Sequence, residues 1–173
     1  MVLMGGILRV KKIAGLACAR VVMLNITAAS AAERPYAVAD EVTRNECGDC
    51  HMVFPPSRLT GNAWKKIMAT LGDHFGEDAS LDAATAKHIE AYLVSKSLDA
   101  KGGIRTEMRL KAWAKKGVVD PLRITETPEW TRHHTQKANY RKMAEDVGYK
   151  RGANCIKCHK GAERGVYEDF GEE

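Results

Sequence analysis

The chain contains the stretch Cys47-Gly48-Asp49-Cys50-His51 and, more than a hundred residues later, the matching stretch Cys155-Ile156-Lys157-Cys158-His159. Both are C-x-x-C-H motifs, which are the attachment signature of c-type haem. Each motif supplies two thiols for the two vinyl groups of one porphyrin, followed by a histidine that binds the iron from the proximal side. The sequence therefore predicts two covalent haem c groups, with thioether bonds at Cys47, Cys50, Cys155 and Cys158 and proximal ligands at His51 and His159.

Two other uses of paired cysteines fit this sequence less well. Zinc ribbons separate their C-x-x-C pairs by about 15–20 residues and need no histidine after each pair. A thioredoxin-like C-x-x-C motif requires a βαβ context, and the sequence shows no βαβ pattern. The remaining cysteine, Cys18, lies in a segment that we expect to be removed, so the mature protein keeps no thiol for a disulfide or a nucleophile.

Residues 1–31 have the pattern of a cleaved signal peptide. A mainly apolar run follows a positive region, and Ala29-Ser30-Ala31 then supplies an A-x-A cleavage signal. The positive region consists of Arg9, Lys11 and Lys12. A membrane anchor is less favoured, because a spanning helix needs about 20 mostly apolar residues and this run contains Arg20 and Asn25. We therefore expect a periplasmic protein whose mature chain is not inserted in a membrane.

The net charge of +5 belongs largely to this leader, which holds basic residues and no acidic ones. The rest of the chain is nearly neutral, so the sequence gives no reason to expect nucleic-acid binding. Charge is unevenly spread, however, because residues 101–117 carry six basic side chains and one acid, Glu107. Such a run is usually a solvated face, and the alternative is a surface that steers a redox partner or pairs with haem propionates.

The spacing of apolar residues predicts an all-α fold. A helix starts at Thr60-Gly61-Asn62, and its apolar residues recur at helical spacing as far as His74 and Phe75. Gly72 weakens the last turn, so we expect His74 at the frayed end of this helix or just beyond it. Ser80 is expected to cap a second helix, whose buried face includes Ile89 and Leu93. A basic helix follows over residues 104–116, then an extended segment over 118–124, and then a helix from Thr127-Pro128-Glu129 to about Val147.

We expect two haem-binding halves, residues 32–98 and 99–173, with a linker over residues 99–103, where two glycines stand among small and polar residues. Three Phe, five Tyr and three Trp make a thin core for the whole chain. Two porphyrins add large apolar surfaces, and burying them supplies much of the missing stabilisation. Protein without haem should therefore be poorly folded.

The residues on the distal side of each iron are less evident than the proximal histidines. Four other histidines are candidates, and Met68 is a fifth because Met/His ligation is common in cytochromes c. His74 and His88 both lie near an apolar helix face, and geometry alone does not separate them. His133 and His134 are about 100° apart on a helix, so they cannot both face one iron.

The chain resembles the bacterial diheme cytochrome c family. The resemblance lies in residues 46–93, including the segment Asp73-His74-Phe75-Gly76, in residues 123–134 with Trp130 and His134, and in residues 154–163. It implies that His74 and His134 are the distal ligands, and His88 and His133 stay as the alternates that helical geometry left open. The doubled His133-His134 departs from the single histidine expected. It also implies association with a membrane cytochrome b and a small, oxygen-binding monohaem cytochrome c.

These observations favour an electron carrier over an enzyme. Two imidazoles on each iron leave no position for O₂ or peroxide, so we expect the iron to change only its redox state. The alternative is a small haem enzyme, a peroxidase or ligand-reducing protein, in which one distal ligand is labile. Dihaem peroxidases are usually far longer, and this chain has few residues to spare for a catalytic pocket.

Overall fold

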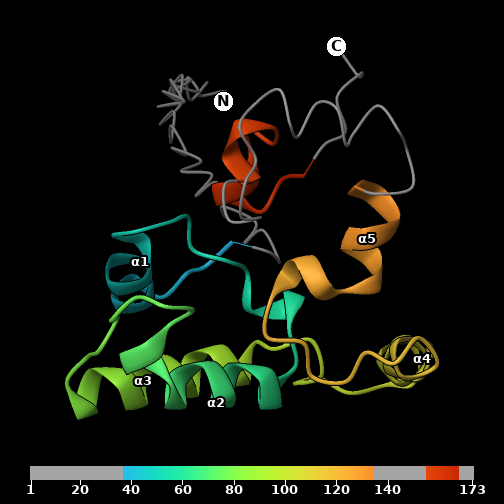
Figure 1. The fold of residues 1–173 in the computed structure, drawn as a ribbon, viewed down its shortest axis with the longest axis horizontal. Helices are drawn as coiled ribbons and strands as arrows, with labels where there is room; N and C mark the ends of the chain where they lie inside the picture. The colour runs from blue at the N-terminus through green and yellow to red at the C-terminus, as the bar shows by residue number, and fades with distance from the viewer. Residues whose placement is uncertain (1–36, 135–154, 168–173) are drawn as a thin grey trace, which may run out of the picture. The chain divides into compact units, whose positions relative to one another are not determined.

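The computed structural model describes residues 37–134 and 155–167, and these residues form helices and turns without a β-strand. The predicted all-α fold is thus confirmed (Figure 1). The α-helices are α1 (Glu41–Gly48), α2 (Gly61–Ala69), α3 (Ala83–Ser95), α4 (Ile104–Ala114) and α5 (Pro128–His134). The predicted leader, and the predicted extension of the last helix beyond His134, lie outside the described residues. No helix within the described ranges is both long and apolar enough to cross a membrane.

The core lies between α2 and α3, which run side by side, and α1 packs against α3 (Figure 1). Trp64 and Ile67 of α2 meet Ile89 and Leu93 of α3, and all four are buried. The indole nitrogen of Trp64 donates a hydrogen bond to the carbonyl oxygen of Pro56 at 2.7 Å, so the one polar atom of this side chain is satisfied inside the core. This helix pair is the support on which the first C-x-x-C-H motif is built.

Side-chain caps fix where the three helices of the first half begin. Thr60 accepts a hydrogen bond from the backbone N–H of Ala63, as expected for the start of α2. Asp40 caps α1 in the same way. The prediction that Ser80 caps the next helix is wrong, because the Asp82 carboxylate accepts from the backbone N–H groups of both Ala84 and Thr85 and starts α3 two residues later.

The helix predicted to carry His74 is shorter than its apolar spacing suggested. α2 ends at Ala69, and a 3-10 turn covers Leu71–Asp73 before the chain reaches His74. Phe75 then takes a positive φ of 59° and Gly76 one of 99°, conformations that a right-handed helix does not contain. His74 therefore lies in a loop beyond the helix, one of the two positions expected from Gly72, and its placement on the same helix face as Trp64 is wrong.

α4 and α5 are held together by one carboxylate. Glu129 of α5 accepts hydrogen bonds from Arg109 and from the indole nitrogen of Trp113, both at 2.8 Å. Trp113 is buried, and Thr127 caps α5 by accepting from the N–H of Trp130. Between the helices, residues 118–123 contain bends at 119–120 and 122–123 and no strand. Asp120 takes a positive φ of 45° and Ile124–Glu126 is a 3-10 turn, so the segment predicted to be extended over 118–124 is not extended along its whole length.

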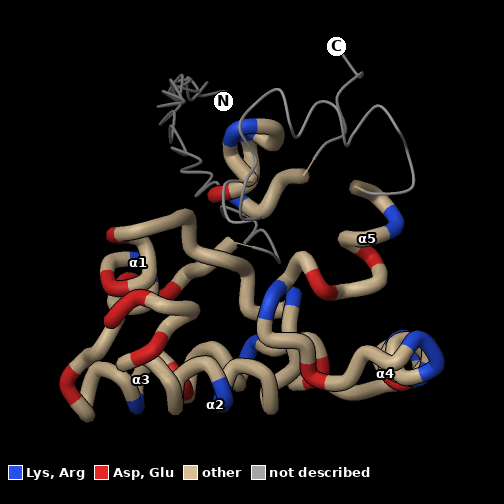
Figure 2. Tube along the Cα trace, in the orientation of Figure 1, with Lys and Arg blue, Asp and Glu red and all other residues tan. Residues whose placement is uncertain are grey.

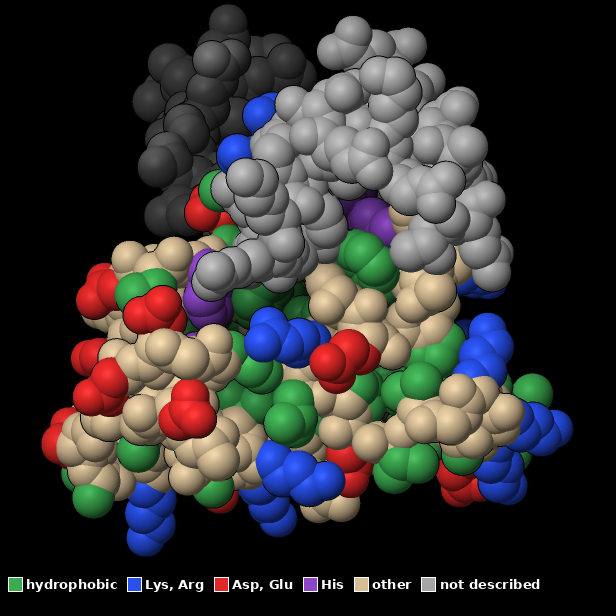
Figure 3. All heavy atoms as spheres, viewed as in Figure 1, with side chains coloured by type: hydrophobic (Ala, Val, Ile, Leu, Met, Phe, Trp, Pro, Cys, Tyr) green, Lys and Arg blue, Asp and Glu red, His purple; other side chains and the backbone are tan. Residues whose placement is uncertain are grey.

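Charge is divided between the two ends of this helical body. Lys and Arg side chains gather around α4, whereas Asp and Glu side chains gather around α1 and the neighbouring end of α3 (Figures 2 and 3). The basic face contains Lys101, Arg105, Lys111, Lys115 and Lys116. Arg109 is also on α4, but its guanidinium forms an ion pair with Glu129 of α5.

Candidate haem sites

The first motif begins inside α1 and continues into the turn that follows it. Cys47 lies in the last turn of the helix and contacts the edge of the core, whereas Cys50 is exposed. Burial, together with the nearby Glu46, raises the pKa of the Cys47 thiol to about 11. This thiol is therefore protonated at neutral pH, which is the opposite of the lowered pKa typical of redox-active or nucleophilic cysteines.

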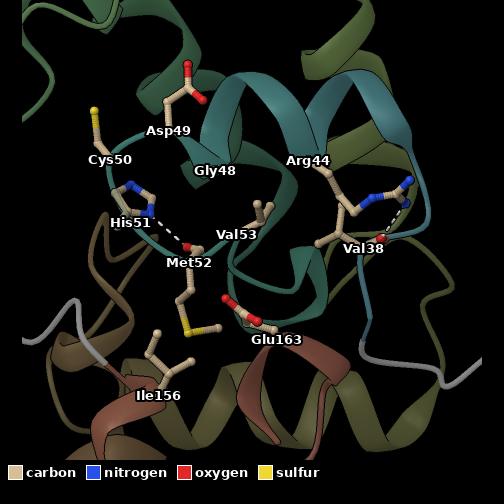
Figure 4. A pocket seen from close by; sticks show the side chains of 10 residues that line it. All are labelled: Val38, Arg44, Gly48, Asp49, Cys50, His51, Met52, Val53, Ile156 and Glu163. Atoms are coloured by element: carbon tan, nitrogen blue, oxygen red, sulfur yellow. Dashed lines mark hydrogen bonds between the residues drawn. The ribbon is translucent and has the colours of Figure 1, made fainter. Parts of the chain in front are cut away.

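His51 follows directly and has one defined ring partner. Its Nδ1 lies 2.7 Å from the carbonyl oxygen of Met52, so Nδ1–H donates this hydrogen bond (Figure 4). Hydrogen bonding of the second ring nitrogen to a backbone carbonyl is the usual way in which proteins orient a metal-binding histidine. The ring is thus prepared to bind a metal through Nε2.

A cavity of about 580 Å³ opens beside this ring. Its lining comes from two segments of the chain, residues 38–53 and the second motif's region, which contributes Ile156 and Glu163 (Figure 4). Cofactor pockets typically have volumes of about 300–1,000 Å³ and mixed apolar and polar walls. A second cavity, of about 440 Å³, is lined by His74, Phe75 and Arg123 among others.

The fold brings His74 opposite His51. The two imidazole rings are stacked with their centres 6.2 Å apart and their planes 22° apart. Burial, followed by the nearby His51 and Arg123, lowers the pKa of His74 from its ordinary value. The neutral imidazole, which is the form that binds metals, is therefore favoured at this position.

The second motif forms a tight turn. Cys155–Lys157 is a 3-10 turn, and the backbone N–H of His159 donates to the carbonyl oxygen of Cys155 at 2.7 Å. Burial raises the pKa of the Cys155 thiol, as at Cys47. The ring of His159 lies edge-on to that of Tyr167, with centres 5.6 Å apart.

His134 lies opposite His159. Their ring centres are 6.0 Å apart, and their planes cross at 74°. Nδ1 of His134 is 2.9 Å from the carbonyl oxygen of Trp130, one helical turn earlier, so Nδ1–H donates this hydrogen bond. The Trp130 ring stacks on the His134 ring at 4.6 Å with an angle of 5° between the planes.

Each histidine pair has the spacing expected for two ligands of a single haem iron. Because an imidazole nitrogen binds such a metal at about 2 Å and lies about 1 Å from its ring centre, two imidazoles on opposite sides of an iron have ring centres about 6 Å apart. The observed separations are 6.2 Å and 6.0 Å. In each histidine pair, one member directly follows a C-x-x-C motif. The two cysteines of that motif form no disulfide, so their thiols can form thioether bonds.

The other candidate ligands have different surroundings. Nε2 of His88 lies 3.0 Å from the carboxylate of Asp40, and the His133 ring lies 3.1 Å from the guanidinium of its neighbour Arg132. Met68 packs against the α2–α3 core. Among the described residues, no three His, Cys, Asp or Glu side chains come together as a metal-ion site.

Three residues at these sites were not singled out from the sequence. The Arg123 guanidinium lies 3.9 Å from the centre of the Phe75 ring, beside His74, and the Arg58 guanidinium lies 4.4 Å from the centre of the Tyr167 ring, beside His159. Tyr167 was missed because it follows the second motif without any recognisable spacing. No local pattern marks the two arginines, because their partners are distant in the sequence.

The model of the dihaem cytochrome c family matches residues 43–167, which include both motifs and all four paired histidines. The chain belongs to the dihaem cytochrome c family. As a member, it carries two covalently bound haem c groups and is a haem-based electron carrier in the broad sense.

Solved dihaem cytochromes c have the same fold. A diheme cytochrome c from Rhodobacter sphaeroides is 41% identical and superposes with a TM-score of 0.65 over 76% of this chain and 99% of that one. A diheme cytochrome type c from Shewanella baltica is 32% identical, with a TM-score of 0.56 over 74% of this chain and 86% of that one. No match was found among curated proteins.

Proposed function

We propose that this dihaem cytochrome c is a periplasmic electron carrier in which both irons have two histidine ligands. In this proposal His51 and His74 hold the first iron, and His159 and His134 hold the second. The protein binds no substrate at either iron, and its activity is the transfer of electrons between other redox proteins.

The observation that carries the proposal is the common spacing of the two histidine pairs, with ring centres 6.2 Å and 6.0 Å apart. Either pair alone has the separation expected for two ligands of one iron. Finding the same separation twice, each time with a C-x-x-C-H histidine as one member, supports ligand pairs over chance ring contacts.

Haem supplies reversible one-electron chemistry when it is bound, and the chain's own residues set the conditions for it. The carbonyl oxygens of Met52 and Trp130 accept the Nδ1–H groups of His51 and His134, so Nε2 of each ring would be the atom that binds iron. Many cytochromes c have a methionine ligand, which raises the reduction potential of the haem. Both proposed sites have an imidazole in its place, so we expect low reduction potentials.

We propose a membrane cytochrome b as electron donor and a small monohaem c-type cytochrome as acceptor. The positive charge around α4 supports docking of an acidic partner. The same helix also has two exposed apolar side chains that a partner could cover, Ile104 and Met108, which are 69% and 64% exposed. Surface charge of this kind mainly accelerates association. Replacing Lys111 and Lys115 by Gln should therefore slow electron transfer to the monohaem cytochrome at low salt and have little effect at high salt.

The visible spectrum tests the ligation most directly. The ferric and ferrous protein should both be six-coordinate and low-spin, and carbon monoxide should leave the ferrous spectrum unchanged. A carbon monoxide complex at one haem in the unmodified protein would instead support the alternative, a small haem enzyme with a labile distal ligand.

The proposed periplasmic location rests on the signal-peptide pattern of residues 1–31. Mass spectrometry of protein from the periplasmic fraction should give the chain cleaved near Ala31 plus two haem masses. An intact leader on haem-loaded protein would contradict this part of the proposal.

A further inference from the structure

The two histidine pairs share a separation but differ in the angle between their rings. The planes of His51 and His74 are 22° apart, close to parallel, whereas those of His134 and His159 are 74° apart, close to perpendicular. Ring orientation is set by the residues around each ligand, so the cause of this difference can be sought in the contacts of each histidine.

At the second site, Trp130 restrains its neighbour's ring in two ways. The Trp130 backbone carbonyl accepts the Nδ1–H of His134 at 2.9 Å, which fixes the direction in which that edge of the imidazole points. The Trp130 indole lies flat on the same imidazole, with centres 4.6 Å apart and planes 5° apart. Residues at i and i+4 share one face of a helix, so α5 itself maintains this stack.

No described aromatic ring restrains the first site in this way. His51 is anchored by the Met52 carbonyl and meets Phe54 at a tilt of 32°. Phe75 meets His74 edge-on, with planes 63° apart. An edge contact leaves an imidazole more freedom to turn than a flat stack does, because the contact area changes little with rotation.

We infer that Trp130 is a positioning residue that holds the His134 ring crosswise to His159 and so gives the second haem a different electronic ground state from the first. The inference rests on the proposed bis-histidine ligation. Each imidazole interacts with the iron d orbital of matching π symmetry. Parallel rings act on the same orbital and split the pair widely, whereas perpendicular rings act on one orbital each and leave the pair nearly degenerate.

Electron paramagnetic resonance of the full-length ferric protein with both haems bound tests the inference. The unmodified protein should show two low-spin signals, one rhombic from the near-parallel pair and one strongly anisotropic, with a single large g value, from the crossed pair. In Trp130→Met, which keeps apolar bulk but removes the flat ring, the large g value should decrease while the rhombic signal stays in place. Trp130→Phe retains an aromatic stack and should keep a spectrum close to that of the unmodified protein.

Phe75→Leu is the matched control, since it removes an aromatic that touches a distal ligand only by its edge. It should leave the large-g signal unchanged. Two rhombic signals in the unmodified protein would overturn the inference without any variant, and so would a Trp130→Met spectrum identical to that of the unmodified protein. A high-spin signal in the unmodified protein would instead refute the proposed ligation, so the two failures are distinguishable.

Discussion

The two proposed distal histidines lie on different kinds of element. His134 comes from the end of a short helix and is restrained by Trp130, whereas His74 comes from a loop between α2 and α3. Loop residues usually have more conformational freedom than helical ones, and partial burial restricts His74. Burial also lowers its pKa, which favours the neutral, metal-binding form. Substitution of single histidines is therefore informative at both sites.

Replacing His74 by Ala should open the first iron. The ferric protein should gain a high-spin component, and the ferrous protein should bind one carbon monoxide per chain, because the substitution removes the imidazole that stacks opposite His51. His88→Ala is the control, since His88 is exposed and its ring contacts the Asp40 carboxylate, 3.0 Å from Nε2. If His88→Ala opens an iron and His74→Ala does not, the ligand assignment is wrong.

At the second site, His134→Ala should give a high-spin ferric haem, whereas His133→Ala should leave both haems low-spin. The physical reason is the orientation of the two neighbours, since the His134 ring faces His159 and the His133 ring contacts Arg132. Electron paramagnetic resonance distinguishes the two variants. A low-spin second haem in the His134 variant would transfer the ligand role to another residue.

At the scale of elements, the first site depends on the packing of α2 against α3. The helices have few large side chains with which to do this, and the buried positions of the α2–α3 core are Leu59, Ala63, Trp64, Ile67, Ile89 and Leu93. Asp99, at the start of the predicted linker, adds to this support, because its carboxylate accepts hydrogen bonds from the N–H of Gly61 and from Ser97. The residues after α3 are thus tied back to the start of α2.

Ile89→Ala should lower the free energy of unfolding by about 2–5 kcal/mol, because the side chain is fully buried and its removal leaves a cavity between the two helices. Val119→Ala is the control. Val119 is 73% exposed, and its truncation should change stability by less than about 0.5 kcal/mol. Denaturant unfolding of the haem-loaded variants measures both values, and equal effects would show that the α2–α3 contact is not where the stability lies.

At the scale of the whole molecule, contacts join the two haem-binding regions. The Arg58 guanidinium lies over the Tyr167 ring, and Tyr167 in turn contacts His159. A residue next to the first half's core is thus linked to the proposed proximal ligand of the second half. Burial raises the pKa of Tyr167 to about 12, which keeps the phenol neutral under ordinary conditions. A cation over a buried aromatic ring contributes about 0.5–2 kcal/mol.

A double-mutant cycle between Arg58→Met and Tyr167→Leu should therefore give a coupling energy of about 0.5–2 kcal/mol in the free energy of unfolding. Arg109→Met provides the matched control, because its guanidinium lies 5.3 Å from the Trp113 ring and pairs with Glu129. Its effect should be additive with that of Tyr167→Leu. A cycle at Arg58 that is also additive would show that this contact does not join the two regions.

The local patterns of the chain were enough to predict its chemistry and its fold class. The two C-x-x-C-H motifs specify the number of haems and their covalent attachment, because vinyl spacing and iron position demand those residues in that order. Helical spacing and caps located α4 and the start of α2. The end of α2 was predicted too late in the sequence, because apolar spacing continues through the 3-10 turn and the loop that carry His74. Periodicity alone does not reveal the positive φ angles at Phe75 and Gly76 that end the helical conformation.

What the sequence determined by itself was thus the cofactor and its covalent anchors, which depend on residues adjacent in the chain. Only the tertiary structure decided which rings stand opposite each other. His51 and His74 are separated by a helix and two turns, and the distance between their rings depends on how that helix packs, which no local rule supplies. The same holds for the crossing angle at the second site and for Arg58 beside Tyr167, since both arise from contacts between segments that are distant in sequence.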